Sequence, residues 1–183
     1  EASSFDGAVM LTASHLPYQR NGMKFFTAEG ALSGKELDSI LHRAHEISTP
    51  ANEFPLRAIY AAHMREVICR EAGEEKGSKV LDGLRIAVDA GNGAAGFFAT
   101  DILEPLGADV SGSVFLAPNG NFPNHVPNPE DKRAMDAAKR AVQASESDLG
   151  VIFDCDGDRG NIVYWDEKTK RALPIAAQEV FAL

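Results

Sequence analysis

Short apolar runs alternate with segments of helical periodicity along most of the chain. Residues 6–12 form one apolar run, which ends at Thr-Ala-Ser-His, and residues 149–153 form another, which ends at Asp-Cys-Asp. Each run is continuous and bounded by turn residues, which is typical of a buried strand. Residues 33–47, 57–73 and 130–145 carry helical patterns instead. The first of these helices should begin at Ser33, because Glu36 completes a capping box.

Further strands are predicted between and after these helices. We expect them at 23–27, at 84–89, at about 109–115 and in a hairpin that starts at Gly160. A helical segment should follow residues 90–96, a Pro- and Asn-rich loop should span 117–129, and a last helix should start at Pro174. Strands that alternate with helices predict an α/β fold with a largely parallel sheet.

The segment from Thr49 to Pro55 contains two prolines and has no periodicity, so it is interpreted as a linker. This divides the chain into a first part, 1–50, and a second part, 51–183. The sequence begins Glu-Ala-Ser-Ser and ends Val-Phe-Ala-Leu inside an apolar pattern. We therefore expect a piece of a longer protein.

Composition restricts the possible partners. A net charge of −9 on 183 residues gives no general attraction to nucleic acid or to anionic membranes, and no apolar run has the length of a membrane span. Cys69 and Cys155 are too few for a disulfide framework and indicate a reducing compartment. We expect a cytoplasmic protein, or one of an organelle such as a plastid. Composition does not set an oligomeric state.

The strongest chemical signal is the stretch Asp154-Cys155-Asp156-Gly157-Asp158-Arg159. Its three carboxylates repel one another, which favours binding of a cation. Oxygen ligands select a hard ion, and Mg²⁺ is the usual choice beside a phosphate. Arg159 would add a planar donor suited to phosphate. Cys155 is interpreted as a small filler, because carboxylates on both sides disfavour a thiolate. The alternative is an acidic exposed turn.

A second candidate site follows the first strand. Ser14 lies beyond the carboxyl end of that strand, where α/β folds place ligand chemistry. A serine hydroxyl can carry a phosphoryl group, and His15 and Lys24 could move a proton or stabilise charge. Asn21-Gly22 lets the chain double back, which could return Lys24 towards Ser14. The pattern alone is also compatible with a structural Ser-His turn.

Two loops carry weaker signals. Residues 90–96, Ala-Gly-Asn-Gly-Ala-Ala-Gly, match the bare pattern of a phosphate-binding loop. With Asp109 as the only nearby candidate for a ribose ligand, we interpret them as a tight, closely packed turn from strand to helix. In the 117–129 loop, His125 stands between prolines. It could face the acidic loop or serve a structural role, and Asn128 or Pro129-Glu130 could start the next helix.

Taken together, these motifs resemble one family. They are T-A-S-H-x-P with N-G-x-K, D-A-x-N-G-A-A-G, F-P-x-H-x-P-N-P-E and D-x-D-G-D-R, in this order. The sequence is similar to the α-D-phosphohexomutases, the phosphoglucomutases and phosphomannomutases. The resemblance implies three-layer α/β/α domains with mixed, largely parallel sheets. It covers the end of the first domain and most of the second, so that domains three and four of the family would be missing.

The resemblance also implies an activity and a set of roles. The protein would be an intramolecular phosphotransferase that interconverts hexose 1-phosphate and hexose 6-phosphate, with hexose 1,6-bisphosphate as activator. Ser14 would carry the phosphate, and His15, Lys24 and Arg159 would be further catalytic candidates. Mg²⁺ would be held by the Ser14 phosphate and by the acidic loop, through Asp154, Asp156 and Asp158.

The sequence departs from the family at two positions in these motifs. Leu16 stands where the family commonly has Asn, and Cys155 stands where many members have Gly or Pro. Leu16 puts a polar contact near Ser14 in doubt, whereas the acidic loop should tolerate Cys155.

Two alternatives stay open. Residues 151–157 also resemble the D-x-D-G signature of haloacid-dehalogenase-type phosphatases, in which Asp154 would be the nucleophile. That interpretation leaves the stretch around Ser14 unexplained. The other alternative is a non-catalytic module that binds a metal or a sugar phosphate. The preferred hexose cannot be determined from these residues.

Overall fold

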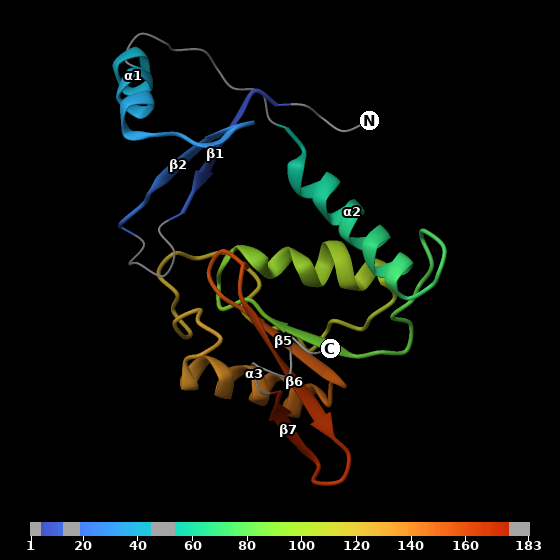
Figure 1. The fold of residues 1–183 in the computed structure, drawn as a ribbon. Helices are drawn as coiled ribbons and strands as arrows, with labels where there is room; N and C mark the ends of the chain where they lie inside the picture. Colours follow the sequence, from blue (N-terminus) through green and yellow to red (C-terminus); the bar gives the residue numbers. More distant parts are fainter. Residues whose placement is uncertain (1–4, 13–18, 45–53, 176–183) are drawn as a thin grey trace. The chain divides into compact units, whose positions relative to one another are not determined.

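The computed structural model describes residues 5–12, 19–44 and 54–175. Residues that lie close together in space fall into two compact units, 1–54 and 55–183 (Figure 1). Each unit is described by itself below. None of the described helices is long and apolar enough to cross a membrane.

The described residues of the first unit form a small antiparallel sheet and one helix. The sheet order is β1-β2-β3, with β1 at Gly7–Leu11, β2 at Met23–Thr27 and β3 at Gly30–Ala31. The helix α1 spans Gly34–Ala44. Ser33 precedes it, and both the backbone N–H and the hydroxyl of Ser33 donate to Glu36, at 2.8 and 2.6 Å. The predicted helix start is thereby confirmed.

The first strand is present as predicted, but its predicted burial is wrong. All five residues of β1 are exposed, and Leu11 keeps 69% of its accessible surface. No described residue of the first unit is buried. The physical reason is that the described part of this unit offers one three-stranded sheet and one helix, which are too few to cover both sheet faces.

The second unit contains a four-stranded sheet with helices. Its elements, in chain order, are α2 (Leu56–Glu71), β4 (Ile86–Asp89), a helical segment at 94–106, α3 (Lys132–Ser145), β5 (Leu149–Phe153), β6 (Gly160–Asp166) and β7 (Arg171–Pro174). Residues 74–77, between α2 and β4, are exposed. The helical segment has the short turns of 3₁₀-helix at both ends and a π-helical turn between them.

The sheet has the order β4-β5-β6-β7 (Figure 1). The strands β4 and β5 are parallel, and the other two pairs are antiparallel. In the parallel pair, Asp89 stands opposite Ile152, so the carboxyl ends of β4 and β5 lie at the same edge of the sheet. The predicted α/β architecture with mixed sheets is confirmed, but the sheet is not largely parallel, since only the pair β4 and β5 runs parallel. The shared edge brings Asp89 and Asp154 into neighbouring positions.

Helices pack on both faces of the sheet. Ala87 belongs to a buried cluster with the α3 residues Ala134, Ala138 and Val142. The next residue, Val88, belongs to a separate cluster with Ala99 of the helical segment. Because neighbouring residues of a strand point to opposite faces, β4 lies between two helical layers. A third cluster joins α2 to the helical segment through residues such as Cys69 and Ile102.

The predicted strand at 109–115 is not formed as a continuous strand. This stretch makes two isolated parallel bridges, from Asp109 to Arg85 just before β4 and from Val114 to Asp89 at the end of β4. Between them, the carboxylate of Asp109 accepts from the Ser111 N–H, and the Ser113 hydroxyl accepts from the Val88 N–H. Side-chain hydrogen bonds of this kind compete with a backbone ladder, so the stretch turns instead of extending.

Two helix boundaries also differ from the prediction. The helix α3 is capped by Asp131, whose carboxylate accepts from the N–H groups of Arg133 and Ala134. Asn128 instead forms a turn before the helix, in which its side chain accepts from the Glu130 N–H. Pro174 does not begin a helix, because it pairs with Val163 as the end of β7. Residues 176–183, where the predicted helix would continue, lie outside the described residues.

Candidate functional site

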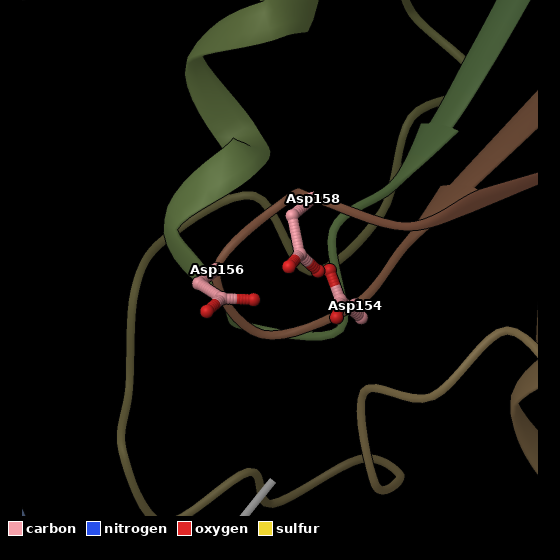
Figure 2. Close-up of side chains that lie close together, drawn as sticks. All are labelled: Asp154, Asp156 and Asp158. Carbon is pink, nitrogen blue, oxygen red and sulfur yellow. The ribbon is translucent and has the colours of Figure 1, made fainter. Parts of the chain in front are cut away.

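Three carboxylates converge in the loop that follows β5 (Figure 2). One oxygen each from Asp154, Asp156 and Asp158 lies within 4.8 Å of the others. Asp154 is buried, with 1% of its surface exposed, whereas Asp156 and Asp158 are exposed. The alternating positions therefore place one fixed and two accessible carboxylates around a common point, which is how a loop offers oxygen ligands to a cation.

Hydrogen bonds within the loop hold Asp154 in place. Its Oδ1 accepts from the N–H groups of Gly157, at 2.9 Å, and Arg159, at 3.2 Å. Its Oδ2 accepts from Nε of Arg159 at 3.0 Å, and its own N–H donates to the Arg159 carbonyl. Gly157 has a φ of 79°, a conformation in which other residues are strained. The sequence Asp-x-x-Gly-x-Arg thus folds back on its own first residue.

The electrostatics of the loop fit a bound cation. Burial by itself raises the pKa of Asp154, but hydrogen bonds from Arg159 and Asp158 and the Arg159 charge hold this pKa below its ordinary value. The pKa of Asp158 is raised, because it hydrogen-bonds to Asp154 and faces the charges of Asp154 and Asp156. A divalent cation would remove this repulsion. Each carboxylate has about four lone-pair positions, so Asp154 can accept from Arg159 and still offer an oxygen.

Cys155 has the properties of a packing residue. Burial, and then the nearby carboxylates of Asp156 and Asp154, raise the pKa of its thiol. A raised pKa disfavours the thiolate that a nucleophile requires. No disulfide joins Cys155 to Cys69. These observations agree with the interpretation of Cys155 as a filler.

The glycine-rich loop at 90–96 packs directly against the acidic loop. The Ala94 N–H donates to the Cys155 carbonyl at 2.8 Å. At Gly93, a Cβ atom would lie 2.7 Å from the Cys155 carbonyl oxygen and 2.9 Å from its Cα. Such distances leave no room for a side chain. The interpretation of 90–96 as a tight turn with close packing agrees with these contacts.

His125 faces the end of β4. Its Nε2 lies 3.0 and 3.1 Å from the two carboxylate oxygens of Asp89, and its Nδ1 lies 3.0 Å from the Val126 carbonyl oxygen. The side chains of His125 and Asp89 keep only 3% and 1% of their exposure. Of the two roles left open for His125, these contacts match the structural one, in a buried pair with Asp89.

The other predicted residues lie in the first unit. Lys24 is an exposed residue of β2, where it stands opposite Met10. The chain doubles back between β1 and β2, and the Thr12 N–H donates to the Gly22 carbonyl at 3.0 Å. Ser14, His15 and Leu16 lie outside the described residues, and so does most of the predicted linker at 49–55.

Comparison with protein families gives two matches that together cover most of the chain. Residues 58–167 match the family described as phosphoglucomutase/phosphomannomutase, alpha/beta/alpha domain II. Residues 1–51 match the corresponding alpha/beta/alpha domain I. The chain belongs to the phosphoglucomutase/phosphomannomutase family. The resemblance drawn from the four motifs is thereby confirmed.

Individual proteins that match this chain support the same family. A phosphomannomutase/phosphoglucomutase of Pseudomonas putida is 33% identical over 95% of this chain and 37% of its own length. A phosphoglucomutase of Neisseria gonorrhoeae is 31% identical over 94% and 37%. A probable phosphoglucosamine mutase of Methanopyrus kandleri is 32% identical over 97% and 38%. The chain thus spans little more than a third of the length of these relatives.

Solved structures support the same family. A phosphoglucomutase/phosphomannomutase family protein from Burkholderia thailandensis matches with a TM-score of 0.63 and 26% identity, over 87% of this chain and 33% of that chain. A structure titled putative phosphomannomutase from Thermus thermophilus matches with a TM-score of 0.58 and 25% identity, over 87% and 36%.

Sequence reasoning missed Asp89 as the partner of His125. A signal was present in the sequence. Asp89 is the last residue of the buried strand Ile86–Asp89, and Asp154 in the same way comes directly after β5. It also missed Asn92, whose side chain donates to the Ala117 carbonyl and accepts from Asn124. That role had no distinctive signal, since asparagines are common in turns.

Proposed function

We propose that the whole protein is a phosphohexose mutase that uses a phosphoserine at Ser14 and Mg²⁺. The observation that carries the proposal is the convergence of Asp154, Asp156 and Asp158 at the carboxyl end of β5, in a chain of the phosphoglucomutase/phosphomannomutase family. The relatives are named for different sugars. The proposal is therefore made for hexose phosphates as a class.

The reaction consists of two phosphoryl transfers. In the first, a hydroxyl oxygen of a hexose monophosphate bonds to the phosphorus on Ser14, and the bond between this phosphorus and the serine oxygen breaks. The hydroxyl proton leaves to a base, and the product is a hexose bisphosphate. In the second, the serine oxygen bonds to the other phosphorus of the turned-over sugar, the bond between that phosphorus and its sugar oxygen breaks, and the sugar oxygen takes up a proton from the acid form of the base. Hexose 1,6-bisphosphate acts as activator because it can phosphorylate an unmodified Ser14 directly.

The residues of the acidic loop would hold the metal. Asp154, Asp156 and Asp158 would bind Mg²⁺ together with an oxygen of the Ser14 phosphate. When bound, the ion supplies positive charge beside the transferred phosphoryl group. Asp154 is already oriented for this role by Gly157 and Arg159. Preorganised ligands need no rearrangement when charge develops.

The remaining roles concern proton transfer and phosphate charge. His15 and Lys24 are proposed to move the hydroxyl proton or to stabilise charge at the transferred group. Arg159 has 44% of its side-chain surface exposed while its Nε contacts Asp154, so the guanidinium can meet a phosphate from the solvent side. The turn-over of the bisphosphate requires grips on the sugar and on the distal phosphate, which we assign to the further domains of the whole protein.

The test is to find the residue that carries the phosphate. The full-length protein is incubated with Mg²⁺ and hexose 1,6-bisphosphate, and its intact mass and peptides are analysed. We expect one acid-stable phosphate on Ser14. The Ser14→Ala variant should carry none and should lose turnover of hexose 1-phosphate.

Three other outcomes would contradict the proposal. An acid-labile acyl phosphate on Asp154 would identify a phosphatase of the haloacid-dehalogenase type. The absence of any phosphate, with turnover unaffected by Ser14→Ala, would exclude the phosphoserine. Full-length protein that binds the sugar phosphate without turnover would be a binding module.

A further inference from the structure

The ring of His125 is surrounded by hydrogen-bond acceptors. Nε2 faces the Asp89 carboxylate, and Nδ1 faces the Val126 carbonyl oxygen. A carbonyl oxygen and an ionised carboxylate only accept, so both contacts are hydrogen bonds when both ring nitrogens carry a proton. These surroundings favour the imidazolium form of His125, in a buried pair with Asp89. Loss of one partner would leave a buried charge uncompensated, which is strongly unfavourable.

Asp89 connects this ion pair to the glycine-rich loop. The Oδ1 atom that contacts His125 also accepts from the Gly91 N–H at 2.9 Å. Gly91 has no space for a side chain, since a Cβ there would lie 2.8 Å from Cβ of Pro127 and 3.0 Å from Cε1 of His125. The 117–129 loop is thus closed over the end of β4, with Asp89 at the junction.

Gly91 and Asn92, the second and third residues after Asp89, form a corner with left-handed backbone, with φ values of 52° and 61°. Glycine adopts this conformation without steric cost, and asparagine tolerates it better than most residues do. Several hydrogen bonds hold the corner: the Asn92 N–H donates to the Phe115 carbonyl, its side chain donates to the Ala117 carbonyl, and Asn124 donates to its side-chain oxygen at 2.7 Å.

The corner ends against the acidic loop at 154–159, which is called the metal loop from here on because of its proposed role. Directly after Asn92, Gly93 lies against the backbone of Cys155, and the Ala94 N–H donates to the Cys155 carbonyl. On the other side, a Cβ at Gly157 would lie 3.1 Å from the Ala95 Cβ. Residues 93–95 therefore contact the backbone between Asp154 and Asp158 and limit where its carboxylates can lie.

We propose that Asp89 and His125 position the metal loop through the Gly91-Asn92 corner. These four residues are called the brace. Neither Asp89 nor His125 needs to touch the metal or the substrate, since they act by fixing residues 93–95 against Cys155. The inference deepens the proposed function and rests on its metal site. Partners that orient metal ligands from outside the ligand set commonly change metal affinity 10- to 100-fold.

The test uses Mn²⁺ as the probe, on the full-length protein without sugar. Free Mn²⁺ is measured by its electron paramagnetic resonance signal, at a temperature below the unfolding transition of every variant. We expect His125→Gln and Asp89→Asn each to raise the Kd for Mn²⁺ about tenfold. The double variant should bind Mn²⁺ no more weakly than the single variant with the higher Kd, because the two residues act as one unit.

Two control variants separate positioning from general destabilisation. Binding of Mn²⁺ lowers the signal of the free ion. Asp156→Asn should abolish this decrease, which would show that the ion binds at the metal loop. Ser147→Ala removes a buried hydroxyl that contacts Ser145 at 2.7 Å, at the opposite end of β5. It should lower stability and leave the Kd for Mn²⁺ unchanged.

A second measurement covers variants that fold poorly. Asp89→Asn keeps the size of the side chain and an acceptor for Gly91, and hydrogen exchange followed by mass spectrometry needs no metal. Peptides that contain 90–96 and 154–159 should exchange faster in this variant, whereas peptides of α2 should not change.

The outcomes separate this inference from the proposed function. If wild-type protein binds Mn²⁺ at the metal loop and both brace variants bind it equally well, the brace has no positioning role. The same holds if Ser147→Ala weakens binding as much as they do. If wild-type protein does not bind Mn²⁺ at these aspartates, the proposed metal site is wrong and the inference is lost with it.

Discussion

Two aspartates at neighbouring strand ends have different environments. Asp89 at the end of β4 faces the imidazolium of His125 and is closed off from solvent. Asp154, after β5, is satisfied by backbone N–H groups and by an arginine that reaches the surface. A buried carboxylate needs such partners, because the cost of removing it from water is several kcal/mol. One aspartate thus serves packing, and the other can face a ligand.

The ion pair at His125 predicts a pH dependence of stability. The hydrogen bond to Asp89, opposed by burial and helped by the Val126 carbonyl and by the charges of Asp89 and Asp131, raises the pKa of His125 above its ordinary value of 6.5. A raised pKa in the folded state means that the stabilisation is fully present below the unfolded value. It is lost as pH rises through the folded value.

This prediction is measured by urea unfolding of wild-type protein and His125→Gln, at several values between about pH 6 and about pH 9. We expect the wild type to be more stable by about 3 kcal/mol at the acidic end, with a difference that shrinks as pH rises. Because both proteins contain Cys155, whose thiol also titrates in the alkaline range, its contribution cancels. A difference that stays constant or grows with pH would contradict the charged histidine.

At the scale of elements, sequence patterns were sufficient where the signal is local. The run at 149–153 is β5, the stretch at 23–27 is β2, and Ser33 with Glu36 starts α1. Each of these depends on neighbours along the chain. The stretch at 109–115 differs, because hydrogen bonds through Ser113 and Asp109 replace a regular ladder.

The candidate site likewise has parts that local sequence predicts and parts that it does not. Asp154, Asp156 and Asp158 are close in sequence, so their convergence could be predicted from spacing alone. Asp89 and His125 are 36 residues apart, and their pairing depends on how the 117–129 loop closes over the sheet. No local pattern contains that information. The burial of β1 could not be predicted either, because burial depends on which other elements cover the strand.

The contact between the helical segment and the metal loop predicts the effect of Gly93→Ala. Gly93 has an ordinary extended backbone, with φ −82° and ψ −167°, so alanine would add no backbone strain. Its Cβ would nevertheless meet the Cys155 backbone at 2.7 Å, and backbone cannot rotate away as a side chain can. We expect a loss of about 1–3 kcal/mol of stability and a Kd for Mn²⁺ that rises about tenfold.

Thermal melting and Mn²⁺ titration of the full-length protein measure both effects. The matched control is Gly34→Ala in α1, where a Cβ would meet nothing within 4 Å. It should leave the Kd for Mn²⁺ unchanged and stabilise slightly, as alanine does in a helix. Equal behaviour of the two variants would show that space at Gly93 does not matter.

At the scale of the whole molecule, the two units differ in their cores. The three buried clusters all lie in the unit that spans 55–183. In the first unit, none of the described residues is buried. A unit with its own buried core can fold as a domain, whereas exposed residues such as Leu11 and Met23 contribute little to stability as they stand.

This difference predicts the behaviour of the separated units. A fragment of residues 55–183 should unfold cooperatively on heating and should bind Mn²⁺ with the affinity of full-length protein whose Ser14 is unphosphorylated, because the three aspartates and the brace lie within it. A fragment of residues 1–54 should show no cooperative transition by circular dichroism. Cooperative melting of the short fragment, or loss of Mn²⁺ binding by the long one, would disagree with this division.

The brace has a consequence for how such genes can recombine. Asp89, the corner, His125 and the metal loop all lie between residues 86 and 159. An exchange between two relatives that transfers this stretch whole keeps all of these packing partners from the same parent. A crossover between positions 89 and 125 instead joins the strand end of one parent to the loop of the other. Hybrids of the second kind should be recovered less often, even where both parents have the three aspartates.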